Sequence, residues 1–219
     1  MELTGLKDTL LEATLPNVLF DGWTDHALRT GAHAAGVGPE MVLHAFPEGA
    51  ADAVPWFSDW ADRRMAEAYA AEDTAALGVS ARVALVVRLR LQVLAGHKEA
   101  VQSWLGWLAL PPHGTLAAKL LYKTIDEIWH TVGDSSTDFS FYTKRVLLAG
   151  VYSATLLHWL GDDSDDHAAT WDFLDRALKA TTGLGRTVAK AGGVGTVLKL
   201  VPSPVRFARQ IRRRAAGRG

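Results

Sequence analysis

Apolar residues recur every three or four positions along most of the chain, which is the spacing of a helix face buried against a core. Alternation of β-branched and polar residues, which marks half-buried strands, is absent, and Ala and Leu dominate. Glycine- and proline-rich turns divide the pattern into segments. The sequence therefore predicts an all-α protein with helices at about residues 6–20, 24–34, 39–46, 55–72, 80–96, 97–109, 115–132, 139–160 and 166–182.

The first three predicted helices have the layout of a helix-turn-helix. Thr24 is placed to cap the second helix, and Gly36 is placed to end it in a left-handed conformation. Pro39 suits the first turn of a short third helix that runs through Phe46. The first helix, which Pro16 is expected to bend, has an apolar face formed by Leu6, Leu10, Leu11, Val18 and Leu19.

Charge is distributed unevenly, although the whole chain has a formal net charge of only −1. Residues 1–60 contain two basic and nine acidic side chains, a net charge of −7. Residues 61–175 contain ten basic and fifteen acidic side chains, and residues 176–219 contain eleven Lys or Arg and no acid. An acidic N-terminal part and a wholly basic tail are features that any functional interpretation must accommodate.

The absence of cysteine, of a signal-peptide pattern and of long apolar segments limits the cellular compartments that we expect for this protein. The 219 residues include no cysteine, which excludes disulfides and thiolate metal sites. The N-terminus lacks the basic and apolar regions of a signal peptide. No segment reaches the roughly 18 uncharged apolar residues that a spanning helix needs. We expect a cytoplasmic protein that is at most peripheral on a membrane, here the inner membrane of a bacterium.

Catalytic motifs are scarce. Glu127 and His130 form a Glu-x-x-His pair on a predicted helix, but a di-iron site needs a second copy, and the chain has none. The acid-rich loop of residues 162–167 could hold a cation loosely, although capping of the next helix is favoured. No nucleophile signature surrounds the serines. The sequence predicts a protein without catalytic residues, metal or cofactor.

Two stretches resemble known families. Residues 24–47, with the Ala35-Gly36-Val37 turn and a short helix ending in Phe46, resemble the N-terminal domain of TetR-type regulators. Residues 133–155, beginning Gly-Asp-Ser-Ser-Thr-Asp-Phe-Ser-Phe-Tyr-Thr-Lys-Arg, resemble the coenzyme Q biosynthesis protein nine family, as do residues 163–174. With Gly22-Trp23-Thr24 and Ile128-Trp129-His130, the resemblance extends over most of residues 8–180.

This resemblance implies a TetR-like fold that is not itself catalytic and that binds isoprenoid lipids in its helical body. It implies presentation of a ubiquinone precursor to a membrane-associated hydroxylase, and docking on the membrane through a final amphipathic helix. The expected division is a helix-turn-helix-like domain (1–52), a helical lipid-binding body (53–182) and a basic tail (183–219). By analogy with TetR-type proteins, a homodimer is expected.

Bulky apolar residues in the body are candidates for lining the lipid site, because clefts between helices are common sites for apolar ligands. The candidates are Trp104, Leu108, Leu120, Leu121, Ile125, Leu147, Val151 and Leu156. The alternative is that these residues only pack the core, as such stripes usually do. Composition does not separate the two.

The start of the predicted helix 139–160 is the candidate partner-binding patch. The family resemblance assigns this role to Asp138, Phe141, Tyr142 and Arg145. Helical spacing places Tyr142 on one face with Phe139, whereas Phe141 and Arg145 are predicted to point outward. The alternative is a capped helix with the aromatic residues buried at its base.

The tail reads as a basic amphipathic surface, of the kind that lies in an anionic membrane interface. Pro202 and Pro204 are expected to break it into two pieces. The alternative is a disordered or nucleic-acid-binding tail. The candidate membrane residues are Leu184, Val188, Val194, Leu198, Val201, Phe207, Arg209, Arg212 and Arg213.

DNA binding is not expected, because affinity for DNA depends largely on Lys and Arg side chains that face phosphates. The presumptive recognition helix, residues 39–46, contains neither, and it lies in the acidic part of the chain. The main alternative function nevertheless remains a TetR-type transcriptional regulator with a hydrophobic effector. A weaker alternative is a membrane scaffold without a ligand.

Overall fold

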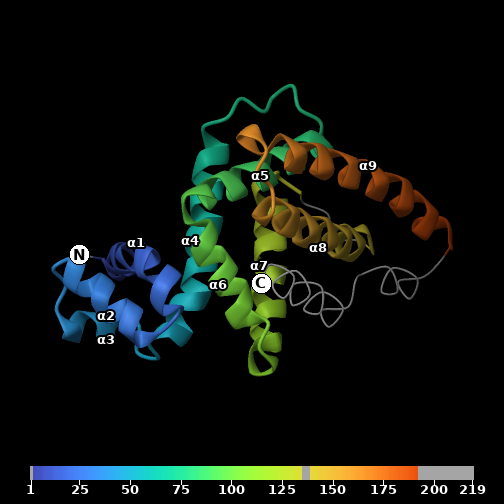
Figure 1. The fold of residues 1–219 in the computed structure, drawn as a ribbon. Helices are drawn as coiled ribbons and strands as arrows, with labels where there is room; N and C mark the ends of the chain where they lie inside the picture. Colours follow the sequence, from blue (N-terminus) through green and yellow to red (C-terminus); the bar gives the residue numbers. More distant parts are fainter. Residues whose placement is uncertain (1, 135–138, 192–219) are drawn as a thin grey trace. The chain divides into compact units, whose positions relative to one another are not determined.

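The structure, a computed structural model, describes the backbone of residues 2–134 and 139–191, and it is helical almost throughout this part (Figure 1). No strand occurs among the described residues, so the predicted all-α class is confirmed. The α-helices are α1 (Leu3–Asp21), α2 (Asp25–Ala34), α3 (Pro39–Ala45), α4 (Ala50–Ala70), α5 (Val79–Val93), α6 (Lys98–Leu108), α7 (Gly114–Thr131), α8 (Phe139–Leu160) and α9 (Ala168–Ala191).

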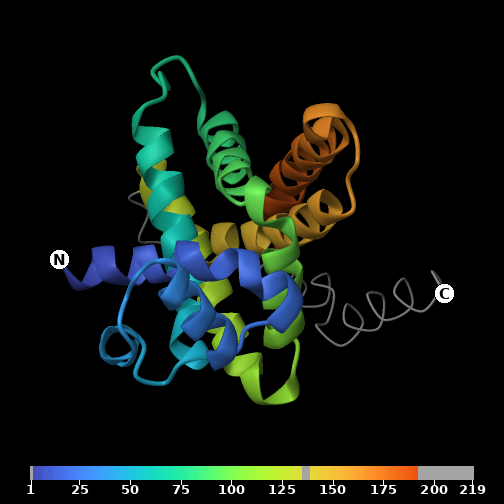
Figure 2. The same ribbon diagram turned by 60° about the vertical axis from the view of Figure 1, so that its left-hand side comes forward.

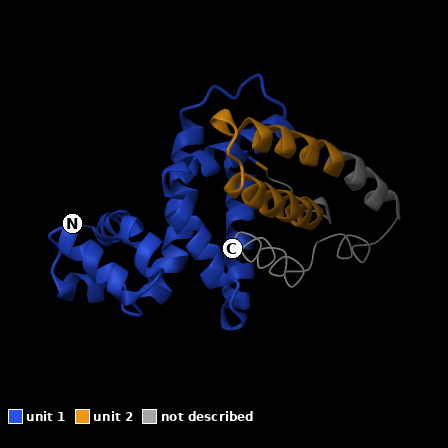
Figure 3. Ribbon diagram, in the orientation of Figure 1, with its two compact units in different colours: residues 1–133 blue, residues 134–219 orange. Residues whose placement is uncertain are grey.

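The chain forms two compact units, residues 1–133 and residues 134–219 (Figure 3). This division does not follow the functional boundaries that we expect at residues 52 and 182. Helix α1 packs against α4 and α6 as well as against α2, so the helix-turn-helix belongs to the same unit as α4–α7. Each unit is described by itself.

The helix-turn-helix forms as predicted. The Thr24 hydroxyl accepts a hydrogen bond from the Ala27 N–H at 3.2 Å, and Gly36 has a φ of +67° after α2. Pro39 opens α3, which ends at Ala45, one residue before the predicted end. Helix α2 crosses α1 closely, because a Cβ on Gly31 would lie 2.8 Å from the Thr14 Cα.

Helix α1 buries most of its predicted apolar face. Leu6, Leu10, Leu11 and Val18 are each at most 2% exposed, and burying each side chain contributes about 1.5–3 kcal/mol. The prediction is wrong for Leu19, which is 55% exposed. Leu19 is one residue after Val18, so about 100° of helical rotation carries it away from the core.

Helix α4 begins five residues before the predicted start, and Pro55 lies inside it. A tertiary contact decides this start: the Asp25 carboxylate at the beginning of α2 accepts a hydrogen bond from the Ala50 N–H at 2.9 Å. Gly49, with a φ of +59°, lets the chain turn there, and a Cβ would clash with the Asp25 carboxylate. The helix start is capped from a distant segment, which local sequence patterns do not reveal.

Helices α4, α5, α6 and α7 complete the first unit. Helix α4 packs against α5 and α7, and α6 packs against α1 and α7. The turn between α6 and α7 and the loop between α4 and α5 lie at opposite ends of this helical group, as both ribbon views show (Figures 1 and 2). A partner or surface that contacts one of these ends therefore need not contact the other.

Helices α8 and α9 pack against each other in the second unit. The predicted end of the last helix at residue 182 is wrong, because α9 continues through Gly183 and Gly185 to Ala191. Each helical glycine costs about 1 kcal/mol relative to alanine, but it does not remove a backbone hydrogen bond as proline does.

Candidate functional site

The predicted lipid-site residues of the first unit lie on α6 and α7. Trp104, Leu108, Leu120 and Ile125 are buried, whereas Leu121 is half-buried. Trp104 is fixed by two contacts to α4: its indole N–H donates to the Val54 carbonyl at 3.0 Å, and its ring packs edge-to-face on Phe57. These contacts make Trp104 part of the α4–α6 interface, and its role toward a ligand stays a prediction.

The other three predicted lipid residues lie on α8, in the second unit. Val151 and Leu156 are buried, and Leu147 is half-buried. The predicted set thus divides between the two units. A pocket shared by the whole set stays a prediction.

A buried polar cluster joins α4, α5 and α7, and sequence reasoning missed it. The Arg90 Nε of α5 donates to the Asp62 Oδ1 of α4 at 2.7 Å, and both side chains are at most 5% exposed. The Thr124 hydroxyl of α7 also donates to Asp62, at 3.0–3.1 Å. Ser58, one turn before Asp62, lies 3.4 Å from Arg90. Because α5 also contains Arg82 and Arg88, no signal in the sequence singled out Arg90 as the buried arginine.

Two repeated clasps join α1 to the opposite side of α4. In the first, the Asp8 carboxylate accepts from the Trp56 indole N–H at 2.9 Å and from Arg63 at 2.5 Å. In the second, Glu12 and Trp60 lie one turn after Asp8 and Trp56, and Arg64 directly follows Arg63; the Glu12 carboxylate accepts from the Trp60 indole N–H and from Arg64, both at 3.1 Å. The Arg63 guanidinium also lies over the Trp56 ring at 4.6 Å. These contacts hold the helix-turn-helix on α4.

The candidate partner patch at the start of α8 is built around a stacked pair. The Arg145 guanidinium lies 3.4 Å from the centre of the Phe141 ring, and Tyr142 contacts the same ring edge-to-face at 5.1 Å. Asp134 makes ion pairs with Lys144 at 2.9 Å and with Arg145 at 3.9 Å. Asp138 lies outside the described residues.

The predicted orientation of this patch is wrong. Tyr142 is the exposed aromatic residue, at 64%, whereas Phe141 is half-buried and Arg145 is only 7% exposed. The carboxylate of Asp134 and the face of the Phe141 ring together draw the Arg145 guanidinium inward, and a helical wheel contains neither contact. The surface that a partner could reach therefore centres on Tyr142.

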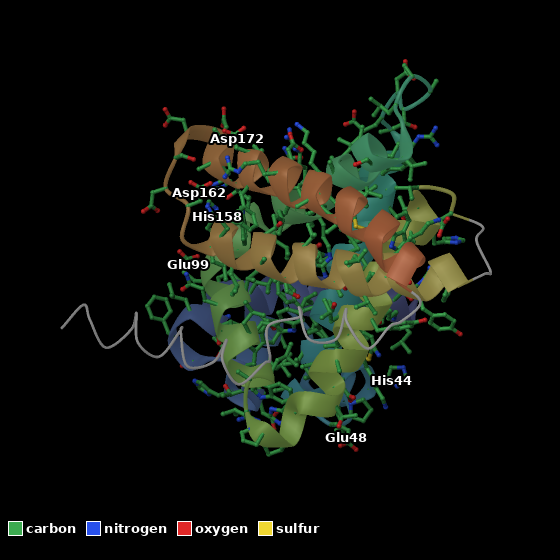
Figure 4. All side chains as sticks on the ribbon, turned by 90° about the vertical axis from the view of Figure 1, so that its right-hand side faces the viewer. His44, Glu48, Glu99, His158, Asp162 and Asp172 are labelled. Atoms are coloured by element: carbon green, nitrogen blue, oxygen red, sulfur yellow. The ribbon has the colours of Figure 1, made fainter. Side chains whose placement is uncertain are left out.

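Asp162 organises the connection between α8 and α9 (Figure 4). Its carboxylate accepts from the Thr170 N–H and hydroxyl at 2.8 and 2.5 Å and from the Ser164 N–H and hydroxyl at 2.9 and 2.6 Å. Burial alone would raise the pKa of Asp162, but these hydrogen bonds outweigh it and hold the pKa well below its ordinary value. The predicted capping role is confirmed for this residue, which is buried instead of solvated.

The outward side of α3 carries no cation. Glu40, Met41, Leu43 and His44 are its exposed side chains after Pro39, with Leu43 64% exposed. Figure 4 shows His44 on this helix. This face of α3 offers phosphates no charge-assisted donor other than the imidazole, and the expectation that DNA is not the partner stays a prediction.

Most of the predicted membrane residues lie outside the described part. Leu184 and Val188 belong to the backbone of α9, and the other seven follow Ala191. Among the helices of the described residues, none is long and apolar enough to cross a membrane. In the same residues, no three His, Asp or Glu side chains gather in an arrangement that could hold a metal ion.

Comparisons with known proteins agree on one family. A family model for COQ9 matches residues 114–185, which contain α7, α8 and most of α9. The chain is 32% identical to the ubiquinone biosynthesis protein COQ9 of Xenopus tropicalis, with 87% of this chain and 62% of the relative covered. The Xenopus laevis COQ9-B protein is 31% identical, with coverages of 87% and 67%, and human COQ9 is 28% identical, with coverages of 88% and 63%.

The fold is similar to that of a solved structure from a different class of protein. A TetR transcriptional regulator from Nitrosomonas europaea superposes with a TM-score of 0.65 at 17% identity, covering 81% of this chain and 98% of the regulator. At this identity the likeness shows the fold alone, and it confirms the predicted TetR-like architecture. The chain spans about 62% of the length of the first curated relatives it matches. From its sequence identity to these relatives, the chain belongs to the COQ9 family.

Proposed function

We propose that this protein is a non-enzymatic accessory protein of ubiquinone biosynthesis that binds an isoprenoid quinone precursor and presents it to a membrane-associated hydroxylase. The observation that carries the proposal is the match over 87% of the chain to a relative named ubiquinone biosynthesis protein COQ9. Within the first unit, α6 and α7 carry bulky apolar side chains of the kind that line sites for apolar ligands, which supports the proposal.

The exposed Tyr142 supports a docking role for the start of α8. It lies within the segment that matches the family model and is 64% exposed beside the Phe141–Arg145 stack. A large aromatic side chain exposed at the surface is typical of an interface hot spot. We propose that the hydroxylase contacts this tyrosine, and that the basic tail brings the protein to an anionic membrane surface.

The alternative of a DNA-binding regulator has less support. The TetR-like fold is shared, but the exposed side chains of α3 include no Lys or Arg. Residues 1–60 have two basic and nine acidic side chains, so this region would be repelled by a polyanion.

Native mass spectrometry tests the lipid-binding role directly. The full chain, purified from a ubiquinone-producing host, is expected to retain a polyprenylated quinone or precursor. Leu120→Phe should reduce the retained lipid because Leu120 is buried on α7, whereas Ala118→Phe, at an exposed position of the same helix, should not. A wild-type protein that is lipid-free and ignores quinone-loaded vesicles would contradict the proposal.

Two exposed tyrosines provide a matched test of the docking role. Tyr142→Ala should weaken co-purification of the hydroxylase, whereas Tyr122→Ala, at a residue 54% exposed on α7, should leave it unchanged in detergent. Equal retention by both variants would place the hydroxylase contact elsewhere.

A further inference from the structure

The turn between α6 and α7, residues 109–114, exposes apolar side chains in a fixed arrangement. Leu110 is 50% exposed, and Pro111 and Pro112 are exposed beside it. His113 closes the turn: its Nδ1 lies 2.8 Å from the Trp107 carbonyl oxygen, and its ring stacks on the Trp107 ring with centroids 3.4 Å apart. The apolar side chains therefore cannot easily fold back onto the protein to escape water.

Every backbone N–H of this turn is satisfied internally or missing. Ala109 donates to the Leu105 carbonyl at 2.9 Å, Leu110 to Trp107 at 3.2 Å, and His113 to Leu110 at 2.9 Å. Gly114 donates to the Pro111 carbonyl, and the two prolines have no N–H. An ordinary loop needs water for these donors, and burying an unpaired donor is costly. Because its N–H groups are already hydrogen-bonded or absent, this turn can move from water into a lipid interface without stranding an unpaired donor.

Two lysines follow the turn on α7; Lys123 pairs with Asp59 of α4 at 2.8 Å, which leaves Lys119 as the cation for an external partner. Between Glu99 and Asp126 the sequence contains Lys119 and Lys123 and no acidic residue, although residues 61–175 as a whole are acidic. Lys119 and Tyr122 are exposed on α7. At a rise of about 1.5 Å per residue, they lie about 7.5 and about 12 Å along the helix from Gly114. Apolar residues at the tip with a cation and a tyrosine behind them match the layers of a bilayer interface.

From these observations we propose that the α6–α7 turn is a membrane contact of the helical body, separate from the basic tail. Its occupant is a lipid surface with anionic headgroups. Leu110, Pro111 and Pro112 enter the interface, Tyr122 lies at headgroup depth, and Lys119 faces the phosphates. This inference rests on the proposed function only in placing the protein at a membrane. It adds that the body, and not only the tail, touches the bilayer.

A single fluorophore tests this contact, because the chain has no cysteine of its own. Ala109→Cys, at an exposed position that leaves the three apolar residues in place, carries an environment-sensitive label. The control label is on Ala76→Cys in the α4–α5 loop, which is exposed and lies at the opposite end of the unit (Figures 1 and 2). Vesicles contain phosphatidylcholine, phosphatidylglycerol and an acyl-chain quencher.

On vesicle-bound protein, the label at residue 109 should brighten and be quenched from the acyl chains, whereas the label at residue 76 should do neither. If the protein floats with the vesicles but the label at residue 109 reports water, the turn is not a membrane contact, and membrane binding through the tail survives. If the protein does not float with vesicles at all, both the turn contact and the proposed membrane association are overturned.

A charge substitution gives an independent readout. Leu110→Glu should weaken vesicle binding by about tenfold, because a leucine side chain is no longer transferred out of water. The matched control is Leu43→Glu on α3, at a leucine that is 64% exposed, and it should bind like the wild type. Lys119→Gln should weaken binding to anionic vesicles by about fivefold and leave binding to neutral vesicles unchanged.

Measuring the lipid that co-purifies with the Leu110→Glu variant distinguishes the membrane contact of the turn from the proposed lipid-binding function. Wild-type lipid content with weakened vesicle binding supports a turn that serves the membrane and not the ligand site. Unchanged vesicle binding by Leu110→Glu would overturn the proposed contact, whatever lipid the protein carries.

Discussion

Helix α4 uses the same chemical partners in two different settings. Toward α5 and α7, Asp62 and Arg90 form an ion pair with side chains at most 5% exposed. Toward α1, Asp8 and Arg63 form an ion pair with side chains 22% and 35% exposed, bridged by the Trp56 indole. One pair stands in the core of the unit and the other at its edge.

The comparison teaches that burial changes what an ion pair does. The buried pair has two further polar neighbours: the Thr124 hydroxyl bonds to Asp62, and the Ser58 hydroxyl lies beside Arg90. These contacts fix where the two charged groups lie in the core. It contributes weakly to net stability, but removing one partner leaves an uncompensated charge in the core. The clasps remain close to water, where each pair contributes little alone and salt screens it. The four predictions below test this contrast.

The largest effect is expected from breaking the buried pair. Arg90→Met should lower the free energy of unfolding by about 3–5 kcal/mol, because the Asp62 carboxylate is left buried without its cation. Urea unfolding at neutral pH measures the change. A loss below about 1 kcal/mol would show that water or another group replaces the guanidinium without penalty.

Replacing both partners tests whether the loss comes from the stranded charge. The double variant Asp62→Leu/Arg90→Met should recover most of the stability that Arg90→Met loses, since well-packed apolar residues can replace a buried ion pair. Additive destabilisation in the double variant would instead mean that the pair is itself strongly stabilising. The same urea titration provides the measurement.

Asp162 gives an intermediate case, a buried carboxylate held by neutral donors. Asp162→Asn should destabilise the protein by about 1–2 kcal/mol at neutral pH. Because the folded pKa of Asp162 lies below its ordinary value, its contribution is complete above about pH 4 and is lost as the pH falls toward the folded pKa. The difference between wild type and Asp162→Asn should therefore shrink in acid.

Asp163→Asn is the matched control for this experiment, because Asp163 is adjacent and exposed. It should leave both the stability and its dependence on pH close to those of the wild type. If Asp162→Asn and Asp163→Asn behave alike between about pH 2 and 7, the hydrogen bonds to Asp162 are not what stabilises the start of α9.

The smallest effect is expected at the clasps. Arg63→Ala should cost less than about 1 kcal/mol in low salt, and the difference should fall further between about 0.05 and 0.5 M NaCl. The loss caused by Arg90→Met should change little over the same range, because buried charges are poorly screened. Equal salt dependence of the two variants would remove the contrast between the two sides of α4.

Some parts of this structure could be predicted because their cause is local. Thr24, Gly36 and Pro39 cap, end and open helices through their own backbone and side-chain chemistry, and all three positions were predicted correctly. The start of α4 could not be predicted, because the Asp25 carboxylate that caps it lies 25 residues earlier. Helix α9 was predicted too short because glycines weaken a helix without ending it.

The candidate site shows the same limit. Helical spacing located the aromatic residues at the start of α8 but assigned them to the wrong sides, because the Asp134–Arg145 and Phe141–Arg145 contacts decide which ring stays exposed. The predicted lipid residues are mostly buried, yet burial is common to a packed core and to a lined pocket. Neither spacing nor burial identifies a ligand.

By itself, the sequence determined the helical class, the TetR-like beginning, the family and the separation of acidic and basic regions. Periodicity, caps and motifs express these properties within a few consecutive residues. Only the tertiary structure decided which charges are buried, as at Asp62 and Arg90, and which apolar groups stay outside, as at Leu110 and Tyr142. The reason is physical: the exposure of a side chain depends on what packs against it, and those partners lie far away along the chain.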